Sequence, residues 1–406
     1  MAERKWYSLA DKVWNGSNLS RAAASVLANA GRAGVDHESC LRFEEHLGDR
    51  LEELARQLQT HQYRPLPVQR VYIPKPDGRQ RALGIPTVRD RVVQQALRQV
   101  LEPIWEPTFS ADSYGFRPGR SALQAVDRIY AAVQAGYVWV VDADIADYFG
   151  SIPHDRLLQA VAERVSDGTV LGWLRDMLQA GIMEDGSVRP SHVGTPQGGV
   201  ISPLMANIYL DPLDRAMGAI PDIHFIRYAD DWCVLARTQE AAEAALVQAQ
   251  AVLTELELTL HPTKTRIVNA AEVAFDFLGF TFFHTPASSR WPEGRWLYGP
   301  KAGAVERLKE RVRSLTRRKR PVNVAMAIED LAPVLRGWGA YFARSPAGSI
   351  FYRLDPWIRE RLRALALKRW RRSQAVDRIW TNQRFADLGL PSLVAMRQRA
   401  ASLSRP

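Results

Sequence analysis

Two adjacent carboxylates, Asp230 and Asp231, follow Tyr228 at a predicted turn between two apolar, strand-like runs. Upstream, the apolar run Val138–Val141 leads to a third acid, Asp144. Carboxylate oxygens are ligands that Mg2+ prefers, and a turn can project both of its acids toward one point. Two metal ions about 4 Å apart can activate a 3′-hydroxyl and neutralise a departing pyrophosphate without a protein nucleophile. The pattern therefore predicts a nucleotidyl transferase with two Mg2+ ions, in which Asp144 and Asp230 bind metal and Asp231 completes the site.

The most specific string in the chain lies between these acidic segments. Gly194–Pro203 reads Gly-Thr-Pro-Gln-Gly-Gly-Val-Ile-Ser-Pro. Its glycines let the backbone approach a substrate closely, and Gln197 offers amide hydrogen-bonding groups without charge. Taken alone, the paired acids could be an ordinary turn and this string a simple glycine-rich loop. Their occurrence together favours a nucleotide-binding active site.

The composition is that of a globular protein without a cysteine metal site. The chain has 406 residues and is 46% hydrophobic, which allows two to three domains. Cys40 and Cys233 lack metal-ligand spacing and the histidines are scattered, so we expect no zinc. Because no apolar run is long enough for a membrane span and the N-terminus has no apolar signal core, we expect no membrane contact and a cytoplasmic location, in the bacterial cytosol or nucleoid.

The positive charge is concentrated toward the C-terminus. The whole chain carries a net charge of +10, whereas residues 301–373 contain 19 Lys/Arg and 6 Asp/Glu. Tryptophan and tyrosine side chains are interspersed with these basic residues. Solvated helices are the alternative for a single Arg-rich helix, but a long basic segment with aromatic residues indicates a surface for nucleic acid.

Apolar periodicity and turn residues predict the order of the elements. We expect a loop over 29–36, a hairpin of strands 68–73 and 80–85, and a strand pair within 275–283. Helices are expected over 41–60, 88–105, 155–165, 203–217 (with Ser202 as N-cap) and 240–258. From residue 301 onward the pattern is helical, with breaks expected at Pro321, Pro333, Pro346 and Pro356. The fold class is therefore α+β, with a helical, basic module after the acids.

These strings resemble a known family. The two acidic segments are similar to motifs A and C of a reverse transcriptase, and the glycine-rich string is similar to its Pro-Gln-Gly segment. Leu335–Phe342, which reads Leu-Arg-Gly-Trp-Gly-Ala-Tyr-Phe, resembles the signature of the maturase (X) domain in group II intron-encoded proteins. The resemblance covers about residues 20 to 372. It implies an RNA-directed DNA polymerase that also acts as a maturase in intron splicing and mobility.

The resemblance also implies an architecture and partners. The fold would be a right-hand polymerase with fingers, a ferredoxin-like palm and a helical thumb. The expected domains are an N-terminal extension (1–62), fingers and palm (63–290), a thumb or maturase domain (291–373) and a short tail without an endonuclease (374–406). The expected partners are intron or template RNA, a DNA primer or target, and dNTPs; the oligomeric state is open.

Further site residues follow from the same resemblance. Lys75 and Arg81 would reach the triphosphate, Gln197 would contact the incoming nucleotide, and Phe149 would lie beneath its sugar and clash with a 2′-hydroxyl. Ile145 would join both the metal ligands and the nucleotide contacts. Arg117 and Arg120 would hold the template, Gly279 would permit the backbone to lie along the primer, and Lys264 would donate a proton to pyrophosphate or serve a structural role.

The sequence departs from the family pattern at a few positions: Leu123, Ala146, Gly150 and Ala340. These substitutions leave the metal ligands intact. Three other functions stay open: an RNA-binding splicing factor with a dispensable polymerase, a free-standing relative in defence or repair, and an RNA-dependent RNA polymerase. Phe149 argues against the last, because it would exclude ribonucleotides.

Overall fold

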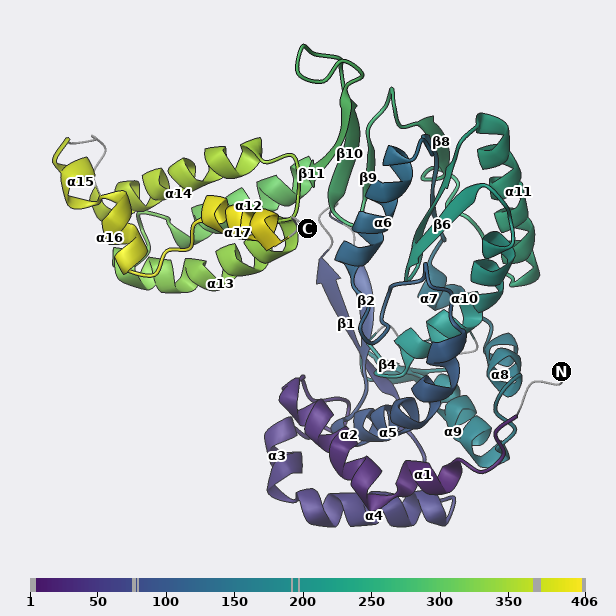
Figure 1. Ribbon diagram of the computed structural model, residues 1–406. Helices are drawn as coiled ribbons and strands as arrows, with labels where there is room; N and C mark the ends of the chain where they lie inside the picture. Colours follow the sequence, from purple (N-terminus) through teal and green to yellow (C-terminus); the bar gives the residue numbers. More distant parts are fainter. Residues whose placement is uncertain are drawn as a thin grey trace. The chain divides into compact units, whose positions relative to one another are not determined.

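The computed structural model describes residues 5–74, 78, 80–190, 193–195, 198–367 and 374–403 (Figure 1). Two of the predicted site residues, Lys75 and Gln197, lie outside these ranges. The chain divides into two compact units. Unit 1 comprises Met1–Ala125 and Trp139–Ile267, and unit 2 comprises Val126–Val138 and Val268–Pro406. The four domains predicted from the motifs are functional regions and do not coincide with these two compact units. Their residue limits stay predictions.

Unit 1 combines helices with strands that pair mainly antiparallel, as expected of an α+β fold. Its helices are α1 (Ala10–Trp14), α2 (Gly16–Ala28), α3 (Cys40–Glu45), α4 (Leu47–Gln59), α5 (Val88–Trp105), the 3-10 helix η1 (Glu106–Thr108), α7 (Tyr148–Ser151), α8 (His154–Ala162), α9 (Gly168–Gln179), α10 (Ser202–Gly218) and α11 (Gln239–Glu255). Its strands are β1 (Val68–Pro74), β2 (Gln80–Ile85), β3 (Trp139–Asp144), β4 (Ile182–Glu184), β5 (Ser187–Arg189), β6 (Ile223–Tyr228) and β7 (Asp231–Ala236). The chain passes between the units three times: within α6 (Ala122–Gln134), between Val138 and Trp139, and within β8 (Arg266–Asn269).

The palm sheet has the strand order β6-β7-β3-β8. In chain order its elements are β3, α10, β6, β7, α11 and β8, which is the β-α-β-β-α-β arrangement of a ferredoxin-like fold. β3 and β6 both pair antiparallel with β7. The predicted ferredoxin-like palm is therefore confirmed. Its helices α10 and α11 pack against each other and line the core with buried apolar side chains.

A second sheet, β2-β1-β4-β5, forms the fingers (Figure 1). β1 and β2 pair antiparallel with Ile73 opposite Arg81, as the hairpin prediction required. β4 adds to β1 in parallel through Val68 and Ile182. The sequence does not predict β4 and β5, because strands of three residues are too short to show a recognisable alternation of apolar and polar residues.

The remaining helix predictions are confirmed with three differences. The helix expected over 41–60 is two helices, α3 and α4, because the backbone of His46 leaves the helical region between them. Ser202 is the first residue of α10 rather than its N-cap, which is Ile201. Pro333 and Pro356 lie inside helices of unit 2 instead of ending them. A proline removes one backbone donor, and buried apolar neighbours on both sides keep these helices continuous.

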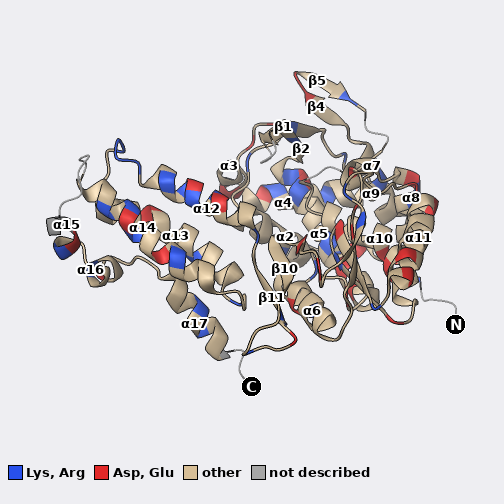
Figure 2. Cartoon of the chain, turned by 90° about the horizontal axis from the view of Figure 1, so that it is seen from above, with Lys and Arg blue, Asp and Glu red and all other residues tan. Residues whose placement is uncertain are grey.

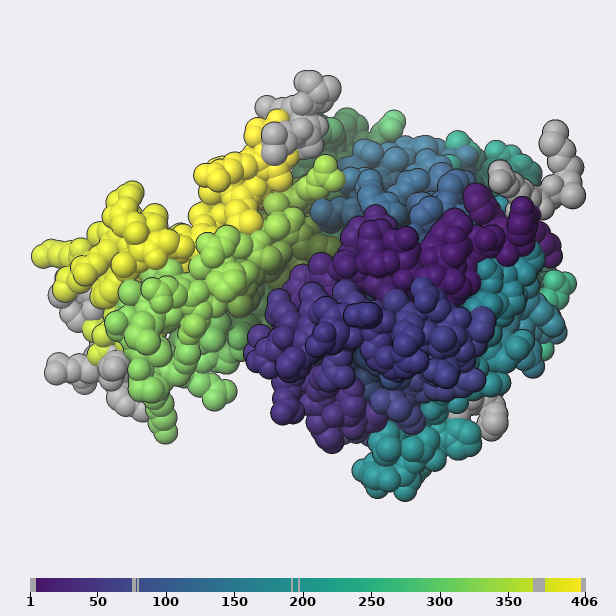
Figure 3. Space-filling view, turned by 90° about the horizontal axis from the view of Figure 1, so that it is seen from below, coloured from purple at the N-terminus to yellow at the C-terminus, as the bar shows by residue number. Residues whose placement is uncertain are grey.

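The N-terminal helices are tied to the palm by one carboxylate. Asp167 is buried and accepts hydrogen bonds from the backbone N–H groups of Leu9 and Ala10, at the start of α1, at 2.8 and 2.9 Å. It also accepts from Thr169 and Val170 at the start of α9. Burial opposes ionisation, but these four donors together lower the pKa of Asp167. The N-terminal helices, purple, form a continuous surface of unit 1 in Figure 3.

Unit 2 joins a small sheet to a group of helices. β9 (Phe275–Phe277), β10 (Phe280–Thr285) and β11 (Arg295–Pro300) form a sheet in the order β11-β10-β9. The helices are α12 (Ala302–Leu315), α13 (Val324–Phe342), α14 (Ser349–Leu367), α15 (Gln374–Ile379), α16 (Asn382–Asp387) and α17 (Leu393–Leu403). The positions of Lys and Arg, blue in Figure 2, are spread along α12, α13 and α14. The basic helical module is therefore confirmed.

The last helix folds back onto this module. α17 packs against α13 and α14. Asp355 of α14 is buried and accepts hydrogen bonds from the Ser392 hydroxyl and from the backbone N–H groups of Leu393 and Val394, so it caps α17. The segment predicted as a tail is thus packed on the thumb helices. None of the described helices is long and apolar enough to cross a membrane.

Candidate active site

The paired acids sit on the tightest turn of the palm. β6 ends at Tyr228 and β7 begins at Asp231, and these two residues are paired across the hairpin, which leaves Ala229 and Asp230 as the loop. Ala229 has φ +59°, the left-handed value that such two-residue hairpins require at their first loop position. On the other side of β7, Asp231 is paired with Asp144 at the end of β3. The register therefore brings all three predicted acids to one edge of the sheet.

A buried arginine holds this turn from behind. Arg227 is fully buried and forms a two-pronged ion pair with Asp214 of α10, with Nε–Oδ1 and Nη2–Oδ2 distances of 2.6 and 2.5 Å. Its Nη1 donates to Ala229 O at 2.9 Å and to Asn207 Oδ1 at 3.0 Å. Burial opposes the charge of Arg227, but Asp214 raises its pKa, so the guanidinium stays charged. The catalytic turn is thus fixed from both α10 and β6.

The segment Ser113–Ala122 packs directly on the same turn. Gly115 lies so close to Ala229 that a Cβ at this position would overlap the backbone nitrogen of Ala229. Asn207 donates to Gly115 O at 2.8 Å, and Tyr114 N donates to Arg227 O at 2.8 Å. Gly115 is therefore required for this segment to approach the turn that carries the acids.

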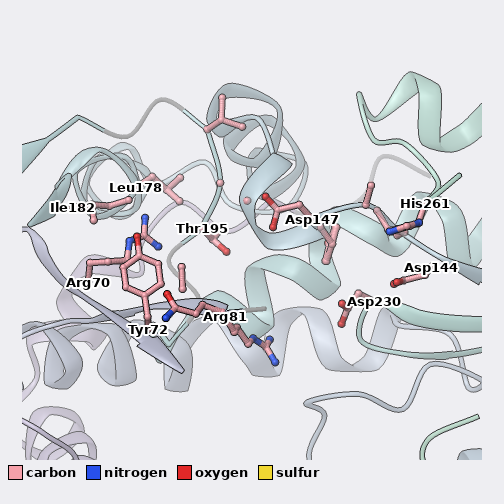
Figure 4. A pocket seen from close by; sticks show the side chains of 18 of the residues that line it. Arg70, Tyr72, Arg81, Asp144, Asp147, Leu178, Ile182, Thr195, Asp230 and His261 are labelled. Atoms are coloured by element: carbon pink, nitrogen blue, oxygen red, sulfur yellow. The ribbon is translucent and has the colours of Figure 1, made fainter. Parts of the chain in front are cut away.

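The acids face a cavity of about 870 Å³ that palm and fingers line together. Figure 4 shows the carboxylates of Asp144 and Asp230 side by side at one end and Arg70 and Tyr72 of β1 at the other. Arg81 of β2 lies between them and reaches toward Asp230 (Figure 4). The lining also includes Ile145, Asp147, Thr195, Asp231, His261 and Lys264. The cavity therefore combines clustered carboxylates with cations that suit a triphosphate.

The electrostatics of the cavity are those of a cation site. Burial and the nearby Asp144 raise the pKa of Asp230, whereas Arg81 opposes this shift. Burial, together with Asp230 and Asp144, raises the pKa of Asp231 to about 6. Repelling acids of this kind are relieved by a bound cation.

The residues present fit Mg2+. Asp144 and Asp230 offer hard oxygen ligands, and the backbone of Ile145 follows directly on Asp144 in the cavity wall. Within the described part of the chain, no three His, Cys, Asp or Glu side chains form a metal-ligand group. Mg2+ is commonly held by one or two carboxylates together with substrate phosphates, so a pair of acids suffices. Lys264 forms an ion pair with Asp144 in this structure. Its proposed proton transfer requires that pair to open and stays a prediction.

Three further residues were predicted to contact the template or the primer: Arg117, Arg120 and Gly279. Arg117 is wrong as a template contact, because it is buried and its guanidinium is fully engaged by Glu106 and by backbone oxygens of Glu106, Ser110 and Ser113. Arg120 lies over the ring of Tyr114 and stays a candidate. Gly279, in unit 2, has φ +81°, which favours glycine, and its primer contact stays a prediction.

Phe149 packs edge-to-face on Tyr148 and is 7% exposed. Its backbone oxygen accepts a hydrogen bond from Thr195 N at 2.8 Å, so Phe149 lies next to the glycine-rich segment. Its role beneath the sugar stays a prediction. Sequence reasoning missed Arg227, Asp214, Asn207 and His154, all buried polar residues around the site. Their partners are distant in sequence, so no local pattern could have indicated them.

The comparisons with known proteins agree with this site. Residues 73–282 match the family model described as "Reverse transcriptase (RNA-dependent DNA polymerase)", and residues 305–385 match "Group II intron, maturase-specific domain". Protein YkfC of Escherichia coli (strain K12) is 34% identical over 301 residues, which are 64% of this chain and 79% of that protein.

Two further matches cover smaller parts of larger proteins. Group II intron-encoded protein LtrA of Lactococcus lactis subsp. cremoris is 37% identical over 171 residues, which are 41% of this chain and 28% of LtrA. Among solved structures, a partial Cas6-RT-Cas1–Cas2 complex contains a chain that is 26% identical, with a TM-score of 0.38, over 61% of this chain and 42% of that one. The family models cover both the site and the helices that follow it. The chain belongs to the reverse transcriptase family, the RNA-dependent DNA polymerases, and carries the group II intron maturase-specific domain.

Proposed function

We propose that this reverse transcriptase extends the 3′-hydroxyl of a primer with dNTPs on an RNA template, using two Mg2+ ions at Asp144 and Asp230. One observation carries the proposal: the pairing of Asp144 with Asp231 brings the acids of β3 and of the β6–β7 turn to the mouth of one cavity. The bound ions would acidify the primer hydroxyl and neutralise the leaving pyrophosphate.

The chain's own residues supply binding and orientation. Asp144 and Asp230 would hold the ions, and the backbone of Ile145 would lie beside them. Asp231 would add a third negative charge that favours cation binding. Arg81 lies at the cavity wall, where a guanidinium can grip triphosphate oxygens with two parallel hydrogen bonds. Lys75 and Gln197 would add a phosphate and a nucleotide contact. Phe149 would select against ribonucleotides.

Primer extension tests this assignment. Asp230→Asn removes a ligand charge with almost no change in shape, and we expect at least a hundredfold loss of dNTP incorporation, roughly the effect of losing several kcal/mol of transition-state stabilisation. Asp142→Asn is the matched control. Asp142 is on the same strand as Asp144, pairs with Arg266 and does not line the cavity. Full activity in Asp230→Asn, or equal losses in both variants, would contradict the site.

The family match of residues 305–385 favours a second activity, binding of structured intron RNA as a maturase. The basic residues of α12 and of the loop after it support this, because Arg317, Arg318 and Lys319 are exposed. Neutralising phosphates releases counterions, so RNA affinity falls as the salt concentration rises. Each lost phosphate contact should reduce the slope of log K against log salt concentration by about one.

A comparison of two variants separates the alternatives. Asp230→Asn should still bind and splice its parent intron RNA, whereas Arg317→Glu with Arg318→Glu should lose splicing and keep dNTP addition to a simple primer. If wild-type protein splices no flanking intron but polymerises, the free-standing reverse transcriptase is favoured. If it splices but never polymerises, the chain is a splicing factor with a dispensable polymerase.

A further inference from the structure

Phe116 is an exposed aromatic residue in a strained backbone conformation. The residue is 46% exposed, and its φ is +59°, a left-handed value that bulky residues rarely adopt. An exposed ring gains little from burial, and left-handed backbone at such a residue is unfavourable. Strain of this kind persists where the surrounding structure imposes it, and it is frequent at functional sites. Phe116 therefore needs an explanation other than core packing.

The chain is fixed on both sides of Phe116. Before it, Gly115 packs against the backbone of Ala229 in the catalytic turn. After it, the guanidinium of Arg117 is buried and pairs with the Glu106 carboxylate at 2.9 Å. Because both neighbours are held in place, they impose the left-handed conformation between them and leave the aromatic ring at the surface.

The pairing of the palm strands places the Phe116 ring next to the acids. Residues directly opposite each other in antiparallel strands have their side chains on the same face of the sheet. Asp144 is paired with Asp231, and Asp231 is paired with Tyr228, so these three side chains form one row. The ring of Phe116 contacts the end of this row, since its centroid lies 6.5 Å from that of the Tyr228 ring, at an interplanar angle of 40°.

This row lies on the face of the palm sheet opposite α10. Successive residues of a strand point to opposite faces. Arg227 points toward α10, where it pairs with Asp214, so its neighbour Tyr228 points the other way. Ser113 is bridged to Arg227 at the edge of β6 that is not paired with β7. The segment that leads to Phe116 therefore extends the sheet beyond β6, and its ring continues the row away from the acids.

The incoming nucleotide and the primer must reach the acids from different sides. Under the proposed function, the nucleotide occupies the cavity between the acids and Arg81 (Figure 4). Neither Tyr228 nor Phe116 is among the described residues that line this cavity. The primer supplies the attacking hydroxyl, which has to meet the metal site while the nucleotide is bound. The primer end therefore approaches from beside the cavity, where the row continues through Tyr228 and Phe116.

We propose that the Phe116 ring packs against the 3′-terminal nucleotide of the primer and holds it beside Asp230. The inference rests on the proposed function, because it takes the end of a primer as the partner. Aromatic rings stack on bases of any sequence, which suits a polymerase that has to extend every primer. The exposed part of the ring supplies the contact surface, and the strained backbone presents it next to the catalytic turn.

Phe116→Asn tests the contact, because asparagine tolerates a left-handed backbone but has no aromatic ring. We expect the KM for primer–template to rise about tenfold, the effect of one lost stacking contact, and the KM for dNTPs to stay within about twofold of wild type. The thermal midpoint should not fall, since the new residue accepts the backbone conformation that strains phenylalanine. Phe116→Tyr keeps the ring and should restore the wild-type KM.

A primer that ends in 2-aminopurine reports the same contact without turnover, because the fluorescence of this base depends on stacking. Binding of wild-type protein or of Phe116→Tyr should change the fluorescence at the primer end, and binding of Phe116→Asn should change it clearly less. When 2-aminopurine is placed in the middle of the primer, wild type and both variants should give the same response.

Tyr7→Asn is the matched control, because Tyr7 precedes α1, is 81% exposed and loses a ring elsewhere on unit 1. Its KM values should equal those of wild type. An unchanged primer–template KM in Phe116→Asn, or an unchanged response at the primer end, would overturn the inference. A raised KM for dNTPs alone would also overturn it, by placing the ring at the nucleotide.

A lower thermal midpoint of Phe116→Asn, with equal losses for both substrates, would assign Phe116 to structure and contradict the contact. If the wild-type protein extends no primer, the proposed function itself fails. That result is distinct, because the fluorescence comparison reports on the primer end without catalysis.

Discussion

Arg227 and Asp214 form a fully buried ion pair directly behind the turn that carries Asp230, with an Nη2–Oδ2 distance of 2.5 Å. The same guanidinium donates to the backbone oxygen of Ala229. The acids of this site are therefore positioned by a charge that never meets solvent or substrate.

Arg227→Met should destabilise the protein by about 3–5 kcal/mol, because it leaves the buried Asp214 carboxylate without its partner. Urea unfolding measures the change. Arg156→Met is the control, since Arg156 and Glu257 form an exposed pair whose loss should cost less than about 1 kcal/mol. Similar values for the two variants would show that the buried pair does not stabilise the palm.

Gly115→Ala should reduce dNTP incorporation at least about tenfold, because the added Cβ overlaps the backbone nitrogen of Ala229 and displaces the turn that carries Asp230. Gly172→Ala in α9 is the control. A Cβ there meets open space, so the change should leave activity unaltered and stabilise the helix by about 0.5–1 kcal/mol. An active Gly115→Ala enzyme would mean that the turn tolerates displacement.

His154→Leu should raise the KM for dNTPs about tenfold, since Gly194 loses the donor that holds it beside the cavity. His154→Gln should restore most of the affinity, because the glutamine amide can reach the same carbonyl. Steady-state kinetics with both variants provide the measurement. Equal behaviour of the leucine and glutamine variants would argue that the histidine acts through its volume alone.

Lys264→Ala should lower the Mg2+ concentration needed for half-maximal primer extension, because the ammonium group that pairs with Asp144 no longer competes with the ion. If Lys264 also protonates pyrophosphate, the maximal rate falls as well. A Mg2+ titration separates the two effects. Arg266→Ala, which removes the arginine that pairs with Asp142 outside the cavity, should leave the titration unchanged.

Asp211→Asn should stabilise the protein above pH 6 and have little effect near pH 4. Burial raises the pKa of Asp211 to about 6, opposed by Arg215 and reinforced by Asp214. The folded state therefore holds this proton at pH values where the unfolded chain has lost it, and stability falls as pH rises from about 4 to 6. A shift of about two pKa units corresponds to about 3 kcal/mol. Unfolding at pH 4.5 and pH 8 should show a clearly larger gain at pH 8.

The acids were predictable because local sequence determines them. The apolar run before Asp144 is enough to predict a strand that ends at this acid. The two apolar runs around Asp230 and Asp231 likewise predict a turn between strands. The same holds for the β1–β2 hairpin and for α5, whose periodicity is long and regular.

The buried polar residues that support the acids were not predictable, because their contacts depend on the folded structure. Arg227 stands in the same string as the acids, yet a charged residue beside a phosphate site suggests a substrate contact rather than burial. Arg117 misled in the same way, since its partner Glu106 is provided by the packing of η1. His154 acquires its role from a contact between distant segments. Only the folded chain shows which charges face water.

The four hydrogen bonds that Asp167 accepts come from the first turns of two helices nearly 160 residues apart in sequence. Neither helix can unwind at that end without leaving the carboxylate short of donors. Opening the start of either helix would remove donors from a buried carboxylate, so the starts of α1 and α9 stabilise each other through Asp167.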